Sequence, residues 1–171
     1  MASSPPPPEA RPDPQELRIE GNAERARAID GLIDLAQHTL QVFDRDLVEG
    51  GWNGADRAER LARFLRRARN VRLSIIVHDT RHVETACPRL LAMLKTYAHA
   101  MAIWRTGAEA RHASDALVIA DGRHYLHRHH VDQPGATLAI EMPQAAKPLV
   151  NRFEEIWATG EPAFGGSVLG L

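Results

Sequence analysis

The stretch SDALVIADGRHYLHRHH, residues 114–130, contains two short apolar runs that meet at Asp121-Gly122. Runs of this kind favour strands, and a glycine at the junction permits the backbone angles of a tight turn. We therefore expect 116–121 and 123–128 to pair as an antiparallel hairpin. The polar end of the second strand carries four histidines, His124, His127, His129 and His130.

Helical and strand patterns alternate along the rest of the chain. Apolar residues recur with helical spacing in four segments, and apolar runs form four further strands. We expect helices at 23–37, 55–69, 87–99 and 147–158, and strands at 39–47, 71–79, 100–105 and 137–141. This order predicts the α/β class, with a mixed, mostly parallel sheet flanked by helices, because connecting helices pack on the sheet.

The length and composition predict one globular domain with two tails. The chain has 171 residues, of which 44% are hydrophobic and 25% charged, as in ordinary globular proteins. We expect a disordered, proline-rich tail at 1–16, a single α/β domain at 17–160 and a C-terminal tail at 161–171.

The charge and the apolar patterning exclude several broad classes. The net charge of −1 gives no overall field toward nucleic acid or anionic lipid. No apolar run is long enough to predict a membrane span, and the N-terminus lacks the apolar core of a signal peptide, so a cytoplasmic location is expected. Cys87 is the only cysteine, which excludes a disulfide framework and a cysteine zinc site.

The Asp-Gly junction after an apolar strand, together with the order of elements over 23–158, resembles half of a phospholipase D-like domain. That family carries the motif His-x-Lys-x4-Asp. If Asp121 takes the aspartate position, Ser114 stands at the histidine and Ala116 at the lysine. In active members the histidine attacks phosphorus and the lysine helps to hold the phosphate. The resemblance therefore implies a non-catalytic, degenerate member, similar to uncharacterised bacterial proteins that keep the fold and lose the motif.

The same resemblance implies a homodimer. Phospholipase D-like sites are built from two halves, either fused in one chain or contributed by two chains, and this chain has room for one half. The two halves meet along the motif edge.

Charged residues follow several of the predicted strands. In open α/β sheets, ligands bind beyond the carboxyl ends of the strands, and arginines there can grip an anion through two hydrogen bonds. We expect a phosphate-containing ligand or a protein partner at this edge. The alternative is that arginines and aspartates pair with one another at a polar rim. The predicted ligand-binding residues are Arg45, Asp46, His78, Asp79, Arg81, Arg105, Asp121 and Arg128.

Two other classes of function stay open. A divergent phosphodiesterase or phosphotransfer enzyme would use His112 or the histidines of 124–130, and clustering of His112 and His127 with Arg105 and Asp121 would favour it. We expect no cofactor and no metal, although His127 and His129 would share a strand face and could chelate an ion.

The third class is a nucleic-acid-binding module. Seven arginines lie between 57 and 72, and Arg60, Arg63 and Arg67 would form one stripe on a helix. We expect no nucleic-acid partner, because such a stripe is usually a solvated helix face and the chain offers no aromatic stacking platform.

Overall fold

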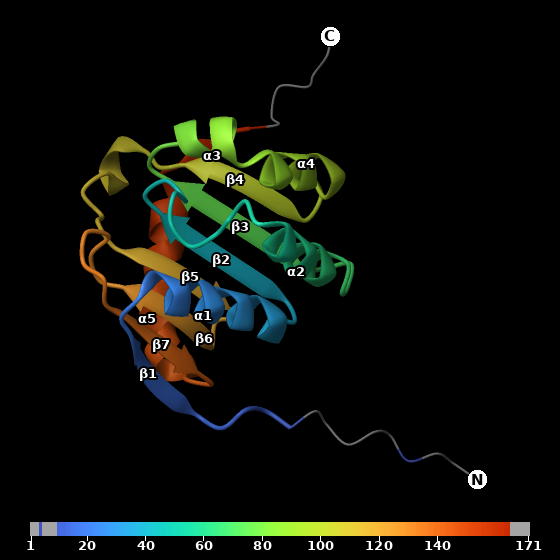
Figure 1. Ribbon diagram of the computed structural model, residues 1–171, viewed down its shortest axis with the longest axis vertical. Helices are drawn as coiled ribbons and strands as arrows, with labels where there is room; N and C mark the ends of the chain where they lie inside the picture. The colour runs from blue at the N-terminus through green and yellow to red at the C-terminus, as the bar shows by residue number, and fades with distance from the viewer. Residues whose placement is uncertain (1–3, 5–9, 165–171) are drawn as a thin grey trace.

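A computed structural model describes residue 4 and residues 10–164. It contains one eight-stranded sheet in the order β1-β7-β6-β5-β2-β3-β4-β8, with helices on both faces (Figure 1). The strands are β1 (Gln15–Ile19), β2 (Thr39–Asp44), β3 (Arg72–Val77), β4 (Met101–Arg105), β5 (Ala116–Ala120), β6 (His124–Arg128), β7 (Ala136–Ile140) and β8 (Glu161–Pro162). The helices are α1 (Asn22–Leu35), α2 (Ala55–Leu65), α3 (Arg81–Ala86), α4 (Pro88–Thr96) and α5 (Pro143–Ala158), with a short 3₁₀ turn at Ala108–Ala110.

The predicted mixed α/β class is confirmed, and all six predicted strands lie in the one sheet. The balance of strand directions differs from the prediction of a mostly parallel sheet. Only β2-β3 and β3-β4 pair in parallel, whereas the other five pairings are antiparallel. The reason is that only the helical crossovers from β2 to β3 and from β3 to β4 join neighbouring strands, whereas short connections join β5, β6 and β7.

Two short strands were not predicted. β1 begins inside the segment expected to be a tail, and four of its five residues are exposed, so it has no apolar alternation. β8 has only two residues and also lies in an expected tail. The remainder of both predicted tails, 1–3, 5–9 and 165–171, lies outside the described residues.

Two helices differ from their predicted bounds because of prolines. The segment 81–96 forms α3 and α4, which are separated at Cys87, where φ is −121° and ψ is 55°. Pro88 disfavours helical geometry in the residue before it, which explains the break. The last helix begins at Pro143 instead of 147, and Pro148 lies inside it.

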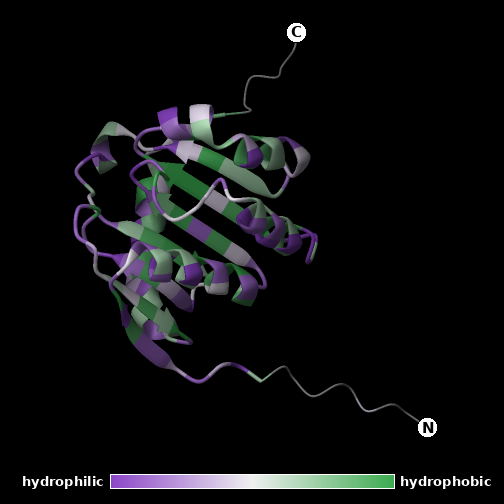
Figure 2. Cartoon of the chain, viewed as in Figure 1, coloured by the Kyte–Doolittle hydropathy of each residue, from purple (hydrophilic) through white to green (hydrophobic). Residues whose placement is uncertain are grey.

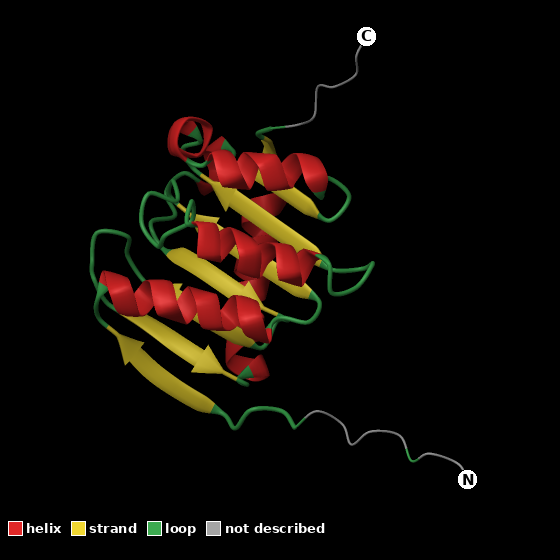
Figure 3. Cartoon of the chain, turned by 45° about the vertical axis from the view of Figure 1, so that its right-hand side comes forward, coloured by secondary structure: helices red, strands yellow, loops and turns green. Residues whose placement is uncertain are grey.

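The core lies on both faces of the sheet. α1, α2 and α4 cover one face and α5 covers the other, as Figures 1 and 3 show. Fully buried side chains such as Leu32, Phe64 and Leu90 fill the first layer, and Phe153 and Ile156 belong to the second. Figure 2 shows mostly hydrophobic residues on the central strands. Because both faces of the sheet are buried, the positions of the strand ends are fixed, and the candidate site lies at these ends.

Among the described residues, no helix is sufficiently long and apolar to cross a membrane.

Candidate ligand site at the carboxyl edge

Most of the predicted site residues lie at one end of the strands of the sheet. β2, β3 and β4 run in parallel and end there, while β5 starts there because it is antiparallel to β2. The end of β6 lies beside the start of β5, since Ala116 pairs with Arg128. We call this the carboxyl edge. Seven of the eight predicted residues lie on it: Arg45, Asp46, His78, Asp79, Arg81, Arg105 and Arg128.

Asp121 lies at the end of the strands opposite the carboxyl edge, because Ala120 pairs with Leu40 at the start of β2. Its carboxylate accepts backbone N–H bonds from Gln37 (2.9 Å), His38 (2.7 Å) and Thr39 (3.1 Å). The structure therefore does not bring Asp121 together with the other seven residues. Its geometry is that of a side chain that closes the turn between α1 and β2.

Three exposed arginines of the carboxyl edge have acidic partners within the chain. For these residues the structure agrees with the polar-rim alternative, and such exposed pairs stabilise a fold only slightly. The hydrogen bonds of Arg81 also lower the pKa of Asp79 to about 2. The pairs are Arg45 with Asp132 (3.1 Å), Arg81 with Asp79 (2.6 Å) and Arg105 with Glu161 (2.9 Å).

His78 is held by the chain at both ring nitrogens. Nε2 lies 2.7 Å from the carbonyl oxygen of Ala113, and Nδ1 lies 2.7 Å from Oγ1 of Thr106. A carbonyl only accepts hydrogen bonds, so Nε2 carries a proton. The ring also contacts Phe43 edge-on at 5.3 Å. His78 therefore ties the end of β3 to the loop before β5.

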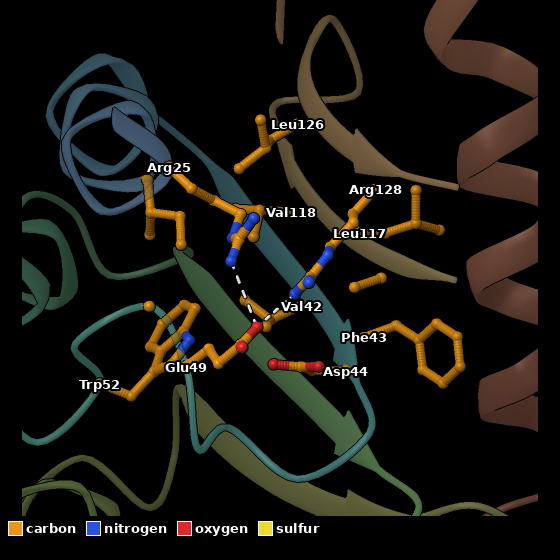
Figure 4. A pocket seen from close by; sticks show the side chains of 13 residues that line it. Arg25, Val42, Phe43, Asp44, Glu49, Trp52, Leu117, Val118, Leu126 and Arg128 are labelled. Carbon is orange, nitrogen blue, oxygen red and sulfur yellow. Dashed lines mark hydrogen bonds and ion pairs between the residues drawn. The ribbon is translucent and has the colours of Figure 1, made fainter. Parts of the chain in front are cut away.

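A second group of charges at the same edge is mostly buried, and sequence reasoning found only one of its members, Arg128. Arg25 of α1 and Arg128 of β6 both bind Oε2 of Glu49, with the Arg25 contact at 3.2 Å (Figure 4). Arg25 is only 5% exposed. Its helical spacing to Ile29 and Leu32, which are core residues, was a signal that it faces inward.

Asp44 completes this buried group. Burial raises the pKa of its carboxyl to about 6, although the backbone N–H of Arg45 donates to it at 2.7 Å. The four charged groups surround a cavity of about 40 Å³, which Ala116 also lines. That volume holds a few water molecules and is far smaller than an ordinary ligand pocket.

Ser114 and Ala116 stand at the positions where the resemblance places the histidine and the lysine of the family motif. Ser114 is exposed, and its hydroxyl forms no hydrogen bond with another described residue; only its carbonyl is used, by the N–H of Val131 at 2.8 Å. Ala116 faces the small cavity beside Arg25 and Arg128. Ala116 is uncharged, but Arg25 and Arg128, whose guanidinium groups Figure 4 shows, line the same small cavity.

The histidines of 124–130 do not form the cluster that would favour an enzyme. His127 bonds to Asp115 at 3.1 Å, and Asp121 lies at the other end of β5. The His127 and His129 rings lie 4.2 Å apart, yet within the described part of the chain no group of three or more metal-ligating side chains is arranged to hold an ion. His112 instead lines a cavity of about 240 Å³ beside α5, with Arg152.

Comparison with known proteins identifies the family. The family model described as Domain of unknown function (DUF7931) matches residues 22–164. The chain belongs to the DUF7931 family. No curated protein sequence matches this family member.

Solved structures show that this DUF7931 chain has the fold of phospholipase D family members. Nuc from Salmonella typhimurium, described as a phospholipase D family member, is 14% identical with a TM-score of 0.63, and the match covers 90% of this chain and all of Nuc. NucT from Helicobacter pylori is 9% identical with a TM-score of 0.62, covering 88% of this chain and all of NucT. The predicted phospholipase D-like fold is thus confirmed.

A third solved structure belongs to a DNA-binding protein. TrmBL2, an archaeal chromatin protein with a novel mode of DNA binding, is 14% identical to the DUF7931 chain with a TM-score of 0.63. The match covers 87% of this chain and 54% of TrmBL2. At this identity the likeness concerns the fold alone.

Proposed function

We propose that the protein is a non-hydrolysing phospholipase D-like module that binds a phosphate-containing anion at its carboxyl edge. The observation that supports this most directly is the environment of Ala116. The nucleophile and the lysine of the family motif are replaced by Ser114 and Ala116, while the buried Arg25 and the partly buried Arg128 border the cavity that Ala116 lines.

Chemistry explains why these two changes favour binding over turnover. A serine without a base is a poor nucleophile, so phosphoryl transfer has no acceptor on this strand. Guanidinium groups, by contrast, match the oxygens of phosphate and stay charged at any physiological pH. Arg25 and Arg128 therefore retain the ability to hold an oxyanion after the means to cleave it is gone.

A ligand screen by thermal unfolding tests this function. Inorganic phosphate, nucleotides and phosphorylated sugars should raise the melting temperature, whereas chloride at equal ionic strength should not, since a ligand that binds only the folded state stabilises it. The Arg128→Gln variant should lose the shift. If no phosphate compound stabilises the wild-type protein beyond the chloride control, the proposed function is wrong.

A second candidate, nucleic-acid binding, rests on the arginines that follow the middle of α2. Two of the seven arginines between 57 and 72 are neutralised: Arg57 pairs with Asp30 at 2.6 Å, and Arg60 contacts three aspartates. Five others have no carboxylate partner among the described residues, and all five are exposed: Arg63, Arg66, Arg67, Arg69 and Arg72.

These five arginines would act on the phosphate backbone without reading bases. Fluorescence anisotropy with labelled single-stranded and duplex DNA measures this, and binding should fall steeply between about 50 and 200 mM salt. The double variant Arg63→Ala, Arg67→Ala should weaken binding, while Arg60→Ala should have little effect because Arg60 is already paired. Equal losses in both variants would argue against the five-arginine surface.

A further inference from the structure

We propose that the carboxylate of Glu49 is a built-in occupant of an oxyanion site formed by Arg25 and Arg128, and that a phosphate monoester group binds by displacing it. This inference rests on the proposed function and names the binding site and its ligand class. Figure 4 shows the arrangement: both guanidinium groups point at one carboxylate oxygen.

The two arginines are held in place without Glu49. Nη1 of Arg25 donates to the carbonyl oxygen of Pro134 at 3.1 Å, and its Nη2 also bonds to Asn22. Nε of Arg128 donates to the carbonyl oxygen of Gln133 at 2.7 Å. These anchors fix the guanidinium groups before any ligand arrives, which lowers the entropy cost of binding.

Glu49, in contrast, is the exposed member of the group. Its side chain is 45% exposed, compared with 6% for Arg25 and 11% for Arg128. It lies on the loop between β2 and α2, whose buried residues Leu47 and Trp52 hold both ends. A change in the short segment between them can therefore withdraw the carboxylate while the arginines stay in place.

The loop backbone favours such a change. Gly50 and Gly51, which follow Glu49 directly, both have positive φ, at 93° and 76°. Glycine populates both signs of φ readily, so this pair can reorient at low cost. The Glu49 side chain can then leave the site without disturbing the sheet.

Electrostatics explain why an anion must take the place of Glu49. Without it, Arg25 and Arg128 would face each other with Asp44 as the remaining nearby carboxyl, and burial together with Arg128 already lowers the pKa of Arg25. A phosphate monoester brings nearly two negative charges and three acceptor oxygens, where the glutamate brings one charge and uses one oxygen. The phosphate can therefore satisfy both guanidinium groups bidentately.

Space at the site sets the class of ligand. The existing cavity of about 40 Å³ is too small for a nucleotide or a sugar ring. A terminal phosphate can occupy the volume that the Glu49 carboxylate leaves, and the exposure of Glu49 places the rest of the molecule in solvent. The site therefore fits a phosphate monoester and not an internal phosphodiester.

Calorimetric titration with inorganic phosphate at neutral pH tests the displacement. The Glu49→Gln variant removes the competing charge and should bind phosphate about tenfold more tightly than wild type. Glu20→Gln is the matched control, because Glu20 is an exposed glutamate paired with Arg18, and neither residue lines the cavity of the site. It should bind like wild type. The double variant Glu49→Gln, Arg128→Gln should lose the gain.

The outcomes separate this inference from the proposed function. If wild type and Glu49→Gln bind phosphate equally, Glu49 does not compete and this inference is wrong, while the proposed function stands. If neither binds, both are wrong. If the double variant keeps the gain, Arg128 is not part of the site. Should Arg128→Gln fold poorly, Arg128→Lys keeps the charge but loses the bidentate geometry, and it should retain only part of the gain.

Discussion

Nε2 of His127 lies 3.1 Å from Oδ2 of Asp115, and Arg152 holds the same carboxylate through Nε at 3.0 Å and Nη2 at 2.6 Å. A histidine oriented by a carboxylate is also an arrangement of hydrolytic enzymes. Here the bidentate arginine uses both carboxylate oxygens, so the trio links β5, β6 and α5. We interpret it as a structural connection.

The first prediction is therefore the absence of phosphodiesterase turnover. Bis-nitrophenyl phosphate should be hydrolysed no faster than in buffer, because Ser114 and Ala116 supply neither nucleophile nor cation. The release of nitrophenol, followed by absorbance, measures this. Turnover that is lost in His127→Ala or His112→Ala would contradict it and identify the histidine that acts.

The second prediction concerns the stability that Asp115 contributes. Burial raises the pKa of its carboxyl, but hydrogen bonds from His127 and Arg152 outweigh burial and hold the pKa well below its usual range. A lowered pKa means that the contribution is present above about pH 4, the unfolded value, and is lost as the pH falls below it. Asp115→Asn should lower the free energy of unfolding at neutral pH by about 1–3 kcal/mol.

Urea denaturation measures this change. Asp132→Asn is the control, because its exposed pair with Arg45 should contribute less than about 1 kcal/mol. Equal losses in both variants would show that the contacts of Asp115 with His127 and Arg152 stabilise the fold no more than a surface pair does.

The third prediction concerns the opposite shift at Asp44. Its pKa of about 6 is raised by burial first, and Asp46 and Glu49 add to it, whereas the Arg45 N–H and Arg128 oppose it. Stability from this group is therefore fully present below about pH 4 and is lost as the pH rises through about 6. Asp44→Asn should unfold at a higher temperature than wild type near pH 8, with the difference shrinking toward pH 4.

Melting curves between about pH 4 and about pH 8 test whether the difference in melting temperature between Asp44→Asn and wild type grows as the pH rises. The Asp46→Asn variant provides the comparison, since Asp46 is a neighbouring aspartate at the same edge. A difference between Asp44→Asn and wild type that is independent of pH would refute the assignment of the raised pKa to Asp44.

The fourth prediction is a homodimer that contacts along the carboxyl edge. Val48, 56% exposed in the loop after β2, lies at that edge, and Leu17, 48% exposed, lies on β1, four strands away from β2. A stable interface buries about 800 Å² on each partner, so a charge within it should be disruptive. Light scattering should give a dimer mass for wild type and Leu17→Asp, and a monomer mass for Val48→Asp.

Two other results would count against that interface. A wild-type mass equal to one chain at micromolar concentration removes the dimer. A monomer produced by Leu17→Asp alone would place the contact at the free edge of β1, where unpaired backbone groups can pair with a second copy.

The parts of the fold that follow from local patterns were predictable. The six strands from β2 to β7 are short apolar runs, and each was placed within a few residues. The direction of β5 relative to β2 was not predictable, because it depends on how the chain crosses the sheet after β4. That direction alone separates Asp121 from the seven other predicted residues.

The candidate site was predictable as an edge but not as a network. Strand ends carry polar residues whose positions follow from the sequence, whereas their partners come from distant segments. Glu49 reaches Arg128 across 79 positions, and no local pattern specifies that contact. Arg25 was not among the predicted residues, although its spacing to Ile29 and Leu32 puts it on the buried side of its helix.

Asp121 is the one motif residue that the chain retains, and it accepts hydrogen bonds from three successive backbone amides. The carboxylate therefore holds the turn between α1 and β2, a structural role that does not depend on catalysis. A search for the family motif that gives weight to this aspartate therefore detects a residue that holds a turn, and not a catalytic group. Only Ser114 and Ala116, seven and five positions earlier in the sequence, indicate whether the catalytic groups of the motif have been lost.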